Sequence, residues 1–163
     1  MKIMRPIIAI LSVVLLTFWS CATEPEWKPL NLLEYGMPIT LLAPDSAEVK
    51  KMNLVLQEDI SIRKGEDYYV QIFGATATTR DATALKESLK EEVLDNPFFS
   101  EMVEEGDYGF IYKDQIDSLH STYGFRYVRL IGDKEYVFQT GLIGSFTEEQ
   151  VRKMYDAVQY REE

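Results

Sequence analysis

Apolar residues alternate with polar ones in the first part of the folded region, and this period of two is typical of β-strands. The alternation predicts a strand at 37–43, which Pro44 closes, and a second strand at 53–63. A third strand is predicted to begin at Tyr68. The polar segment 64–67 between the second and third strands favours a turn. These two strands are therefore predicted to form a long β-hairpin.

The apolar spacing then changes to the period of a helix. Leu85, Leu89 and Val93 recur every four residues, with charged residues between them. Asp81 is suited to accept hydrogen bonds at the start of this helix, and Pro97 disfavours its continuation. The apolar residues that follow are predicted to form a short turn of helix packed on the sheet: Phe98, Phe99, Met102 and Val103.

A second hairpin is predicted after this helix. Tyr108, Phe110 and Tyr112 alternate as in a strand, and a polar loop follows them. Two further strands are expected at 125–131 and 136–138, joined by a tight turn. Both faces of these strands carry bulky residues, which indicates a central position covered on both sides.

The chain ends in a predicted amphipathic helix. Thr147 and Gln150 have the spacing of a capping box, and the following apolar residues would share one face. Together the elements predict an α+β fold: an antiparallel sheet of two long hairpins, packed by a mid-chain helix and a C-terminal helix.

This order of elements resembles the PsbP-like fold, an antiparallel sheet packed between helices. The matching features are an opening strand with Pro38 and Pro44, the long hairpin, a mid-chain helix followed by the segment 96–98, the second hairpin and the last helix. The resemblance spans 35–160 as an order of elements, without a diagnostic motif. It implies a non-enzymatic accessory or partner-binding role, as in lumenal photosystem proteins and small bacterial lipoproteins.

The first 21 residues have the layout of a secretory signal. Lys2 and Arg5 precede an apolar run at 7–18, and Ser20 and Cys21 follow. The segment resembles the signal peptides of bacterial envelope lipoproteins, in which the cysteine is acylated and the chain is cut before it. Ser20 and Cys21 fit that motif, whereas Trp19 departs from its usual small residue.

The predicted domains are therefore a signal peptide at 1–20, a lipidated cysteine with an extended tether at 21–34, and a single α+β domain at 35–163. Ala22 is not the aspartate that retains lipoproteins at the inner membrane, so the outer membrane is the expected destination. Two alternatives stay open: an uncleaved membrane anchor, and a cleaved, soluble chain with one free thiol.

The net charge of the chain limits the classes of partner that it can bind. The 163 residues include 17 basic and 27 acidic side chains, a net charge of −10. Removal of residues 1–20 takes away Lys2 and Arg5, which leaves 15 basic residues against 27 and a net charge of −12. Such a chain repels phosphate backbones and anionic headgroups, which excludes nucleic acid and leaves the lipid anchor to hold the membrane.

No motif for catalysis, a metal or a cofactor stands out in the sequence. Asp114, Asp117 and His120 recur every three residues and would face one way on a helix, but a polar loop is the favoured interpretation. A second group of acids is interpreted as an exposed helix end rather than a calcium loop: Glu101, Glu104, Glu105 and Asp107. The sequence therefore predicts no catalytic, metal-binding or cofactor-binding residues.

Tyrosine is abundant, with ten residues beside eight phenylalanines. Tyrosine surfaces bind proteins, peptides and sugars because they combine area with a hydroxyl group. Strand alternation favours core packing for most of them. The candidate binding surface consists of Tyr108, Tyr112, Tyr127 and Tyr136.

These observations favour a small envelope lipoprotein with a non-catalytic accessory role and an envelope protein as its partner. One alternative is a lipoprotein that binds a small ligand, either a peptide, a sugar or a lipid. Another is an immunity-type protein whose acidity suits a basic toxin.

Overall fold

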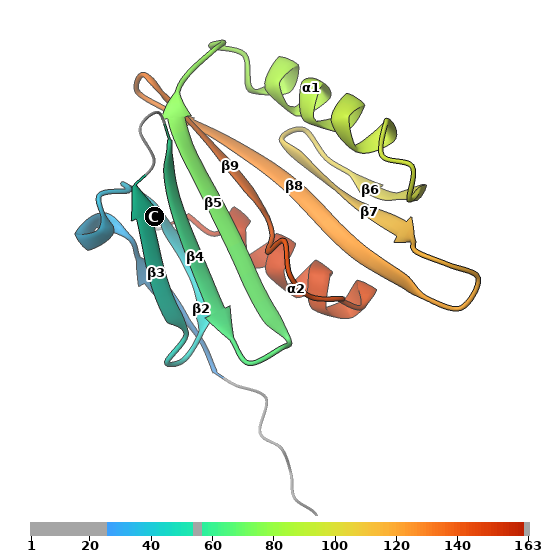
Figure 1. Cartoon of the computed structure of the whole chain (residues 1–163). Coiled ribbons are helices and arrows are strands. Elements are labelled where there is room, and N and C mark those ends of the chain that lie inside the picture. The colour runs from blue at the N-terminus through green and yellow to red at the C-terminus, as the bar shows by residue number, and fades with distance from the viewer. Residues whose placement is uncertain (1–25, 54–56, 162–163) are drawn as a thin grey trace, which may run out of the picture.

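The structure, a computed structural model of the chain, describes residues 26–53 and 57–161 (Figure 1). The predicted signal peptide and Cys21 lie outside these residues. The described elements are, in chain order, β1 (Trp27–Asn31), the 3-10 helix η1 (Leu33–Tyr35), β2 (Thr40–Pro44), β3 (Glu48–Asn53), β4 (Glu58–Lys64), β5 (Tyr68–Thr76), α1 (Ala82–Leu94), β6 (Phe99–Glu105), β7 (Gly109–Gln115), β8 (Ser121–Ile131), β9 (Lys134–Thr140) and α2 (Glu148–Gln159).

The strands form a seven-stranded antiparallel sheet in the order β3-β4-β5-β9-β8-β7-β6, and β1 pairs with β2 in a separate ribbon. Both predicted hairpins are present, as β4–β5 and β8–β9. They join edge to edge where Ile72 of β5 pairs with Phe138 of β9. The α+β class and the antiparallel sheet are thus confirmed, and β9 occupies the centre of the sheet.

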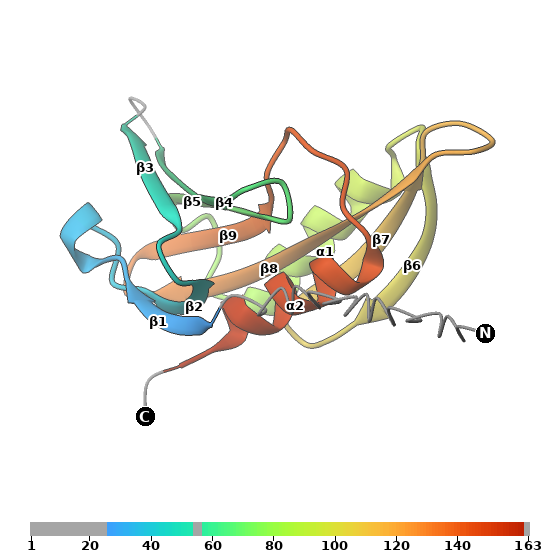
Figure 2. The same cartoon turned by 90° about the horizontal axis from the view of Figure 1, so that it is seen from below.

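The two faces of the sheet are covered unequally. Figure 2 shows α1 on one side of the sheet and α2 with β1 on the other. On the α2 side, the helix and the β1–β2 ribbon cover a core whose central members are fully buried, among them Ile62, Ile72 and Phe138. On the α1 side, a smaller cluster of Val93, Phe110 and Tyr112 fills the space beneath the helix.

Both helices begin at the residues that the sequence predicted. The Asp81 carboxylate accepts hydrogen bonds from the backbone N–H groups of Thr83 and Ala84, at 2.9 and 3.2 Å. Thr147 and Gln150 form the predicted capping box at the start of α2. These caps satisfy amide groups that have no partner within the helix.

The predicted helical turn after Pro97 was wrong, because this segment is the edge strand β6. Its pairing with β7 shifts register between Phe99 and Glu101 and again between Met102 and Glu104. Each irregularity adds a residue to one strand and interrupts the alternation of side chains. The sequence of β6 therefore lacks the period of two that identifies a strand.

The N-terminal part of the fold also differs from the predicted tether and strand limits. Trp27–Asn31 forms β1 rather than part of an extended tether, and Leu32 after it is fully buried. The Trp27 ring packs edge-on against Tyr68 with 5.3 Å between ring centroids. Glu48–Asn53 forms the edge strand β3, which was not predicted because its charged side chains leave no clear apolar alternation. Solvent-exposed edge strands commonly carry such charges.

Candidate functional site

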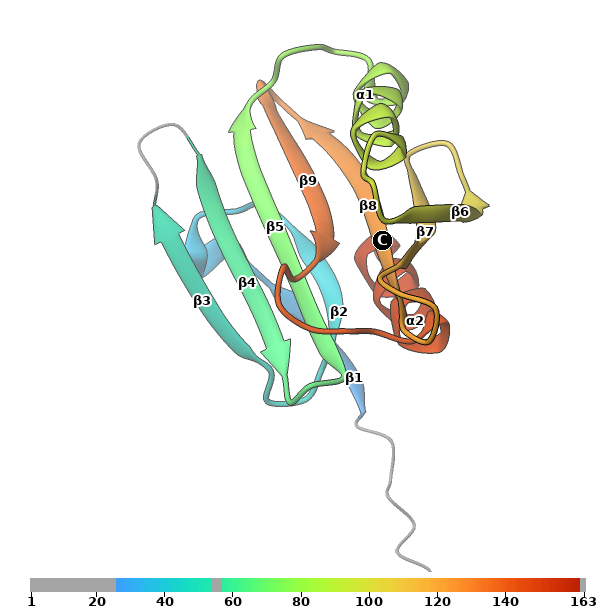
Figure 3. The ribbon, with the colours of Figure 1, turned by 45° about the vertical axis from the view of Figure 1, so that its right-hand side comes forward.

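The α1 side of the sheet is only half covered. The helix packs on β8 and on the cluster beneath it, and among the described residues no helix lies over β3, β4 and β5 on this side. Figure 1 looks onto this uncovered part, and Figure 3 shows α1 standing beside it. We call it the open face and define it by the side chains that alternate with the core residues: Ser61, Arg63, Tyr69, Gln71, Phe73 and Gln139.

A buried polar pair lies in the middle of the open face. The Gln71 Nε2 atom donates a hydrogen bond of 2.8 Å to Asp59 Oδ2, and both residues are nearly inaccessible to solvent. Gln139 lies beside Gln71 in the register of β5 and β9 and is also buried. The Gln71 Oε1 atom accepts no hydrogen bond from any described residue. A buried acceptor without a partner costs about 1–3 kcal/mol, which a donor from a bound molecule would recover.

Two tyrosine rings lie flat on the sheet because glycines leave room beneath them. A Cβ atom on Gly141 would come within 2.1 Å of the Tyr69 ring, and one on Gly124 within 2.6 Å of the Tyr112 ring. The Gly141 amide donates to the Tyr69 carbonyl at 2.8 Å, which places the loop after β9 against the start of β5. Glycine at these two positions therefore lets the two tyrosine rings pack directly against the backbone.

Each of these tyrosines is covered by an arginine. The guanidinium carbon of Arg63 lies 5.7 Å from the Tyr69 ring centroid, and that of Arg126 lies 5.6 Å from the Tyr112 centroid. Arg126 Nη1 also donates a 3.1 Å hydrogen bond to the Tyr112 hydroxyl. Contacts of this kind hold aromatic rings in one orientation. The α1 side thus presents ordered aromatic and guanidinium groups at two places.

A cavity of about 290 Å³ adjoins the open face. It lies between the C-terminal end of α1 and the loop after β9, and its lining includes Asn96, Tyr112, Asp114, Arg126 and Gln139. The Asp114 Oδ1 atom is buried there without a hydrogen-bond donor among the described residues. Burial raises the pKa of the Asp114 carboxyl, and the positive charge of Arg126 acts in the opposite direction. The cavity therefore offers acceptor oxygens beside an aromatic wall.

A larger hollow of about 630 Å³ lies at the other end of α1, lined in part by Arg80, Arg129 and Arg161. The Arg129 guanidinium is engaged in holding the end of α2, because its Nη2 donates to the carbonyls of Val158 and Tyr160. The carboxylate that caps α1 also borders this hollow. These hydrogen bonds favour a structural role for Arg129 over ligand binding in the hollow.

The four predicted tyrosines do not share one surface. Tyr127 and Tyr136 are buried in the core on the α2 side, as the core-packing alternative predicted. Tyr112 is buried on the α1 side and lines the smaller cavity, while the half-exposed Tyr108 borders the larger hollow. The pairing of Gly109 with Tyr127 causes this split, because it places Phe110 and Tyr112 on the face opposite Tyr127.

The candidate binding residues that sequence reasoning missed are polar ones within strands. Gln71 interrupts the apolar run of β5, and Gln139 does the same near the end of β9. A polar residue inside an apolar strand can be recognised in the sequence. Its neighbour across the sheet cannot, because only the pairing of β5 with β9 brings the two amides together.

Asp117 and His120 stabilise a turn between β7 and β8. Asp117 Oδ1 accepts the amides of Leu119 and His120 at 2.7 and 2.9 Å, and Oδ2 lies 2.8 Å from His120 Nδ1. The hydrogen bond from the Leu119 amide, followed by that from the His120 ring, lowers the pKa of Asp117. Asp114 lies apart from them on β7, and the part of the chain that the structure describes contains no group of three potential metal ligands.

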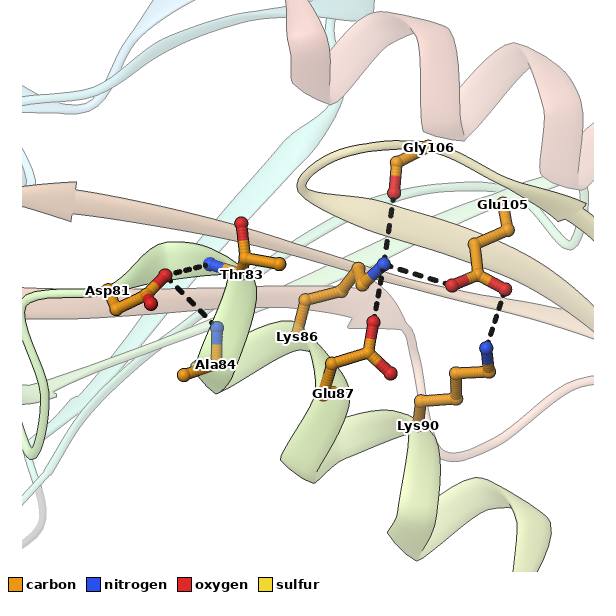
Figure 4. A network of polar contacts seen from close by, with 8 residues as sticks. All are labelled: Asp81, Thr83, Ala84, Lys86, Glu87, Lys90, Glu105 and Gly106. Atoms are coloured by element: carbon orange, nitrogen blue, oxygen red, sulfur yellow. Dashed lines mark hydrogen bonds and ion pairs between the residues drawn. The ribbon is translucent and has the colours of Figure 1, made fainter.

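The acidic residues near Gly106 attach α1 to the edge of the sheet. Lys86 has a side chain only 6% exposed, and its ammonium contacts Glu87 at 2.8 Å and Glu105 at 2.9 Å (Figure 4). Lys90 contacts the second oxygen of Glu105 at 2.6 Å. The predicted exposed helix end is thus a strand, and its glutamate anchors the neighbouring helix α1.

Glu105→Gln is expected to lower the free energy of unfolding by about 1.5–3 kcal/mol, because the buried Lys86 ammonium loses a charge-assisted hydrogen bond. Lys86→Met is the matched variant and is expected to change stability by less than about 1 kcal/mol. It removes the buried charge itself and leaves Glu105 paired with Lys90. Urea unfolding of both variants measures the difference, and equal losses would contradict this account.

The same pair makes stability depend on pH. Hydrogen bonds from Lys90 and then Lys86 lower the pKa of Glu105 from its ordinary value of 4.5. The contribution of the carboxylate is therefore present above that value and is lost as the pH falls below it. Glu105→Gln should remove this part of the acid sensitivity.

Compared with models of protein families, with curated proteins and with solved structures, the chain gives no match. None of the helices among the described residues has the length and apolar character needed to cross a membrane.

Proposed function

We propose that this chain is a small, lipid-anchored lipoprotein of the cell envelope that binds a partner protein and has no catalytic role. The anchor in this proposal is an acyl-modified Cys21, exposed by removal of residues 1–20, and the outer membrane is its destination. The basic, apolar and small residues before Cys21 support the anchor. The open face supports the binding role.

The uncovered half of the sheet carries this proposal. No described helix lies over Gln71 on this side, so a partner can approach without unfolding an element, and the buried Gln71 Oε1 becomes accessible when the neighbouring side chains shift. A partner that presents N–H or O–H groups would satisfy this atom, and Tyr69 and Phe73 would supply apolar contact beside it. Such a surface fits an accessory subunit that docks on another envelope protein.

The charge of the open face favours this role over the binding of a basic toxin. The exposed Arg63 lies opposite Glu48 in register, and Lys50 contacts the Glu48 carboxylate at 3.2 Å, so the charges here are balanced. A toxin-binding surface would instead concentrate carboxylates for fast, salt-sensitive association. Acidic residues are more concentrated elsewhere, as in Glu105 and its neighbours on β6.

The smaller cavity supports a second candidate function, the binding of a small ligand. Its volume of about 290 Å³ accommodates a compact group, and Asp114 Oδ1 inside it accepts no hydrogen bond from the described residues. An amine or hydroxyl group from a peptide or a sugar meets this requirement. Such a ligand would raise the melting temperature of the purified protein.

Photo-crosslinking in intact cells tests the partner-binding role. A photoreactive phenylalanine analogue replaces Phe73 on the open face, and the same analogue at Leu33 is the control. Leu33 is 65% exposed on η1, away from the open face. We expect one dominant protein adduct from position 73 and none from position 33. A folded, membrane-bound protein without an adduct at position 73 would contradict the role.

The PsbP-like layering stays a prediction. An antiparallel sheet with α1 on one face and α2 on the other supports it. The accessory role that this resemblance implies agrees with the proposal, which rests on the open face rather than on the fold.

A further inference from the structure

The smaller cavity contains two opposite charges that do not touch. Asp114 of β7 and Arg126 of β8 both line this cavity of about 290 Å³. Burial raises the pKa of the Asp114 carboxyl, and the Arg126 charge, which counteracts this rise, lies within electrostatic range of it. Among the described residues no ion pair joins the two groups. A gap in the cavity therefore separates an anion from a cation.

The Asp114 carboxylate is the strongest acceptor in the cavity. Its Oδ1 atom is buried and accepts no hydrogen bond from the described residues. Hydrogen bonds between charged groups are about twice as strong as those between neutral groups. Because a buried carboxylate without a donor is unfavourable, an ammonium group is the ligand group that stabilises Asp114 most.

Arg126 supplies the complementary donors. Its Nη1 atom donates to the Tyr112 hydroxyl at 3.1 Å and to the Phe125 carbonyl at 3.2 Å. The other two nitrogens, Nε and Nη2, donate to no described residue and are not buried. These two nitrogens form one edge of the planar guanidinium, and such an edge matches the two oxygens of a carboxylate. Arg126 is thus held in place with its carboxylate-binding edge free.

The rest of the cavity lining is uncharged. Asp114 and Arg126 are the only charged side chains among the described lining residues, so their charges cancel. The Tyr112 ring and the buried Phe146 provide apolar surface beside them. A volume of about 290 Å³ is at the lower end of the range of about 300–1,000 Å³ that is usual for ligand pockets. The cavity therefore suits one small, neutral molecule with an apolar part.

We propose that the smaller cavity binds a free amino acid, with its α-ammonium group on Asp114, its α-carboxylate on Arg126 and an apolar side chain against Tyr112 and Phe146. This inference rests on the second candidate function, the binding of a small ligand, and names its chemical class. A simple amine would leave Arg126 unpaired and meet its positive charge. A simple carboxylate would be repelled by Asp114. A zwitterion satisfies both groups, which provides the specificity.

Isothermal titration calorimetry with three forms of leucine tests this site. The full-length chain, purified in detergent, is titrated with L-leucine, with L-leucinamide, which lacks the carboxylate, and with N-acetyl-L-leucine, which lacks the ammonium group. We expect each blocked form to bind at least about tenfold more weakly than L-leucine, because each leaves one charged group of the cavity unpaired. L-leucinamide or N-acetyl-L-leucine that binds as tightly as L-leucine would overturn the inference.

Two variants with matched controls locate the binding. Asp114→Asn and Arg126→Gln are each expected to weaken L-leucine binding at least about tenfold. Asp107→Asn is the control for the first, since Asp107 is an exposed acid in the turn between β6 and β7. Arg63→Gln is the control for the second, since Arg63 also covers a tyrosine ring but lies outside the cavity. Both controls should bind L-leucine like the unaltered chain.

The melting temperature separates lost binding from lost structure. Asp114→Asn removes an uncompensated buried charge, so the melting temperature of this variant should not fall. Equal weakening of L-leucine binding by Arg63→Gln and Arg126→Gln would show that the cavity does not hold the carboxylate, and would overturn the inference.

Further outcomes distinguish this inference from the proposed functions. L-leucine that gives no heat at millimolar concentration would overturn it, and a photo-crosslink at position 73 would still support partner binding. A neutral sugar that raises the melting temperature of the unaltered chain but not of Asp114→Asn would preserve the small-ligand function and overturn the amino-acid assignment.

Discussion

Replacing Phe138 by alanine is expected to lower the free energy of unfolding by about 3–5 kcal/mol, the largest loss that a single truncation should cause in this fold. Phe138 is fully buried on β9, the central strand of the sheet. Its ring lies 5.7 Å from that of Tyr127, and the Arg129 guanidinium lies 5.3 Å from its centroid. Truncation would leave a void among rigid neighbours and remove contacts that join the two hairpins.

The matched control is Phe98→Ala. Phe98 is 48% exposed and follows α1, so its truncation is expected to cost no more than about 0.5 kcal/mol. Trp27 provides the probe, because it packs against Tyr68 in the folded protein and is exposed to water on unfolding. Similar losses for both variants in urea would show that β9 is not the centre of the core.

Cys21→Ser is expected to abolish acylation and the processing that depends on it. Serine cannot form the thioether on which a lipoprotein anchor is built, so the chain should keep residues 1–20 and incorporate no lipid. Two or three acyl chains hold a protein essentially permanently, because each buried CH₂ contributes about 0.8 kcal/mol. Metabolic labelling with a fatty-acid analogue, combined with the mass of the envelope-bound form, measures both effects.

Ala22→Ser is the control for this experiment, because it alters the neighbouring residue and leaves the thiol in place. This variant should be labelled and cut like the unaltered chain. If Cys21→Ser produced an envelope form of unchanged mass and location, the lipid anchor would be excluded. The uncleaved anchor or the cleaved chain with a free thiol would then remain.

Local rules identified most of the elements because their signals are contained in short segments. Asp81 and Thr147 cap helices through amides two or three residues away, and the polar turn at 64–67 separates two alternating strands. Edge strands lack this clarity, since one side of an edge strand faces water. The charged β3 and the irregular β6 were therefore missed or misassigned.

The candidate site was harder to predict, because its members come from strands that are distant in the sequence. Gln71 and Gln139 are neighbours only through the pairing of β5 with β9. The tyrosines illustrate the same limit. Tyr112 and Tyr127 both follow the alternation of their own strands, yet they lie on opposite faces of the sheet. Register, which local alternation leaves open, decides which face each residue occupies.

The sequence by itself determined the α+β class, the antiparallel hairpins, the starts of the two α-helices and the acidity of the chain, because each depends on composition or on contacts within a few residues. Tertiary structure alone decided which half of the sheet stays open and where the unpaired oxygens of Gln71 and Asp114 lie. These features depend on strand order and on the position of α1. Both are set by packing between segments that are far apart in the chain.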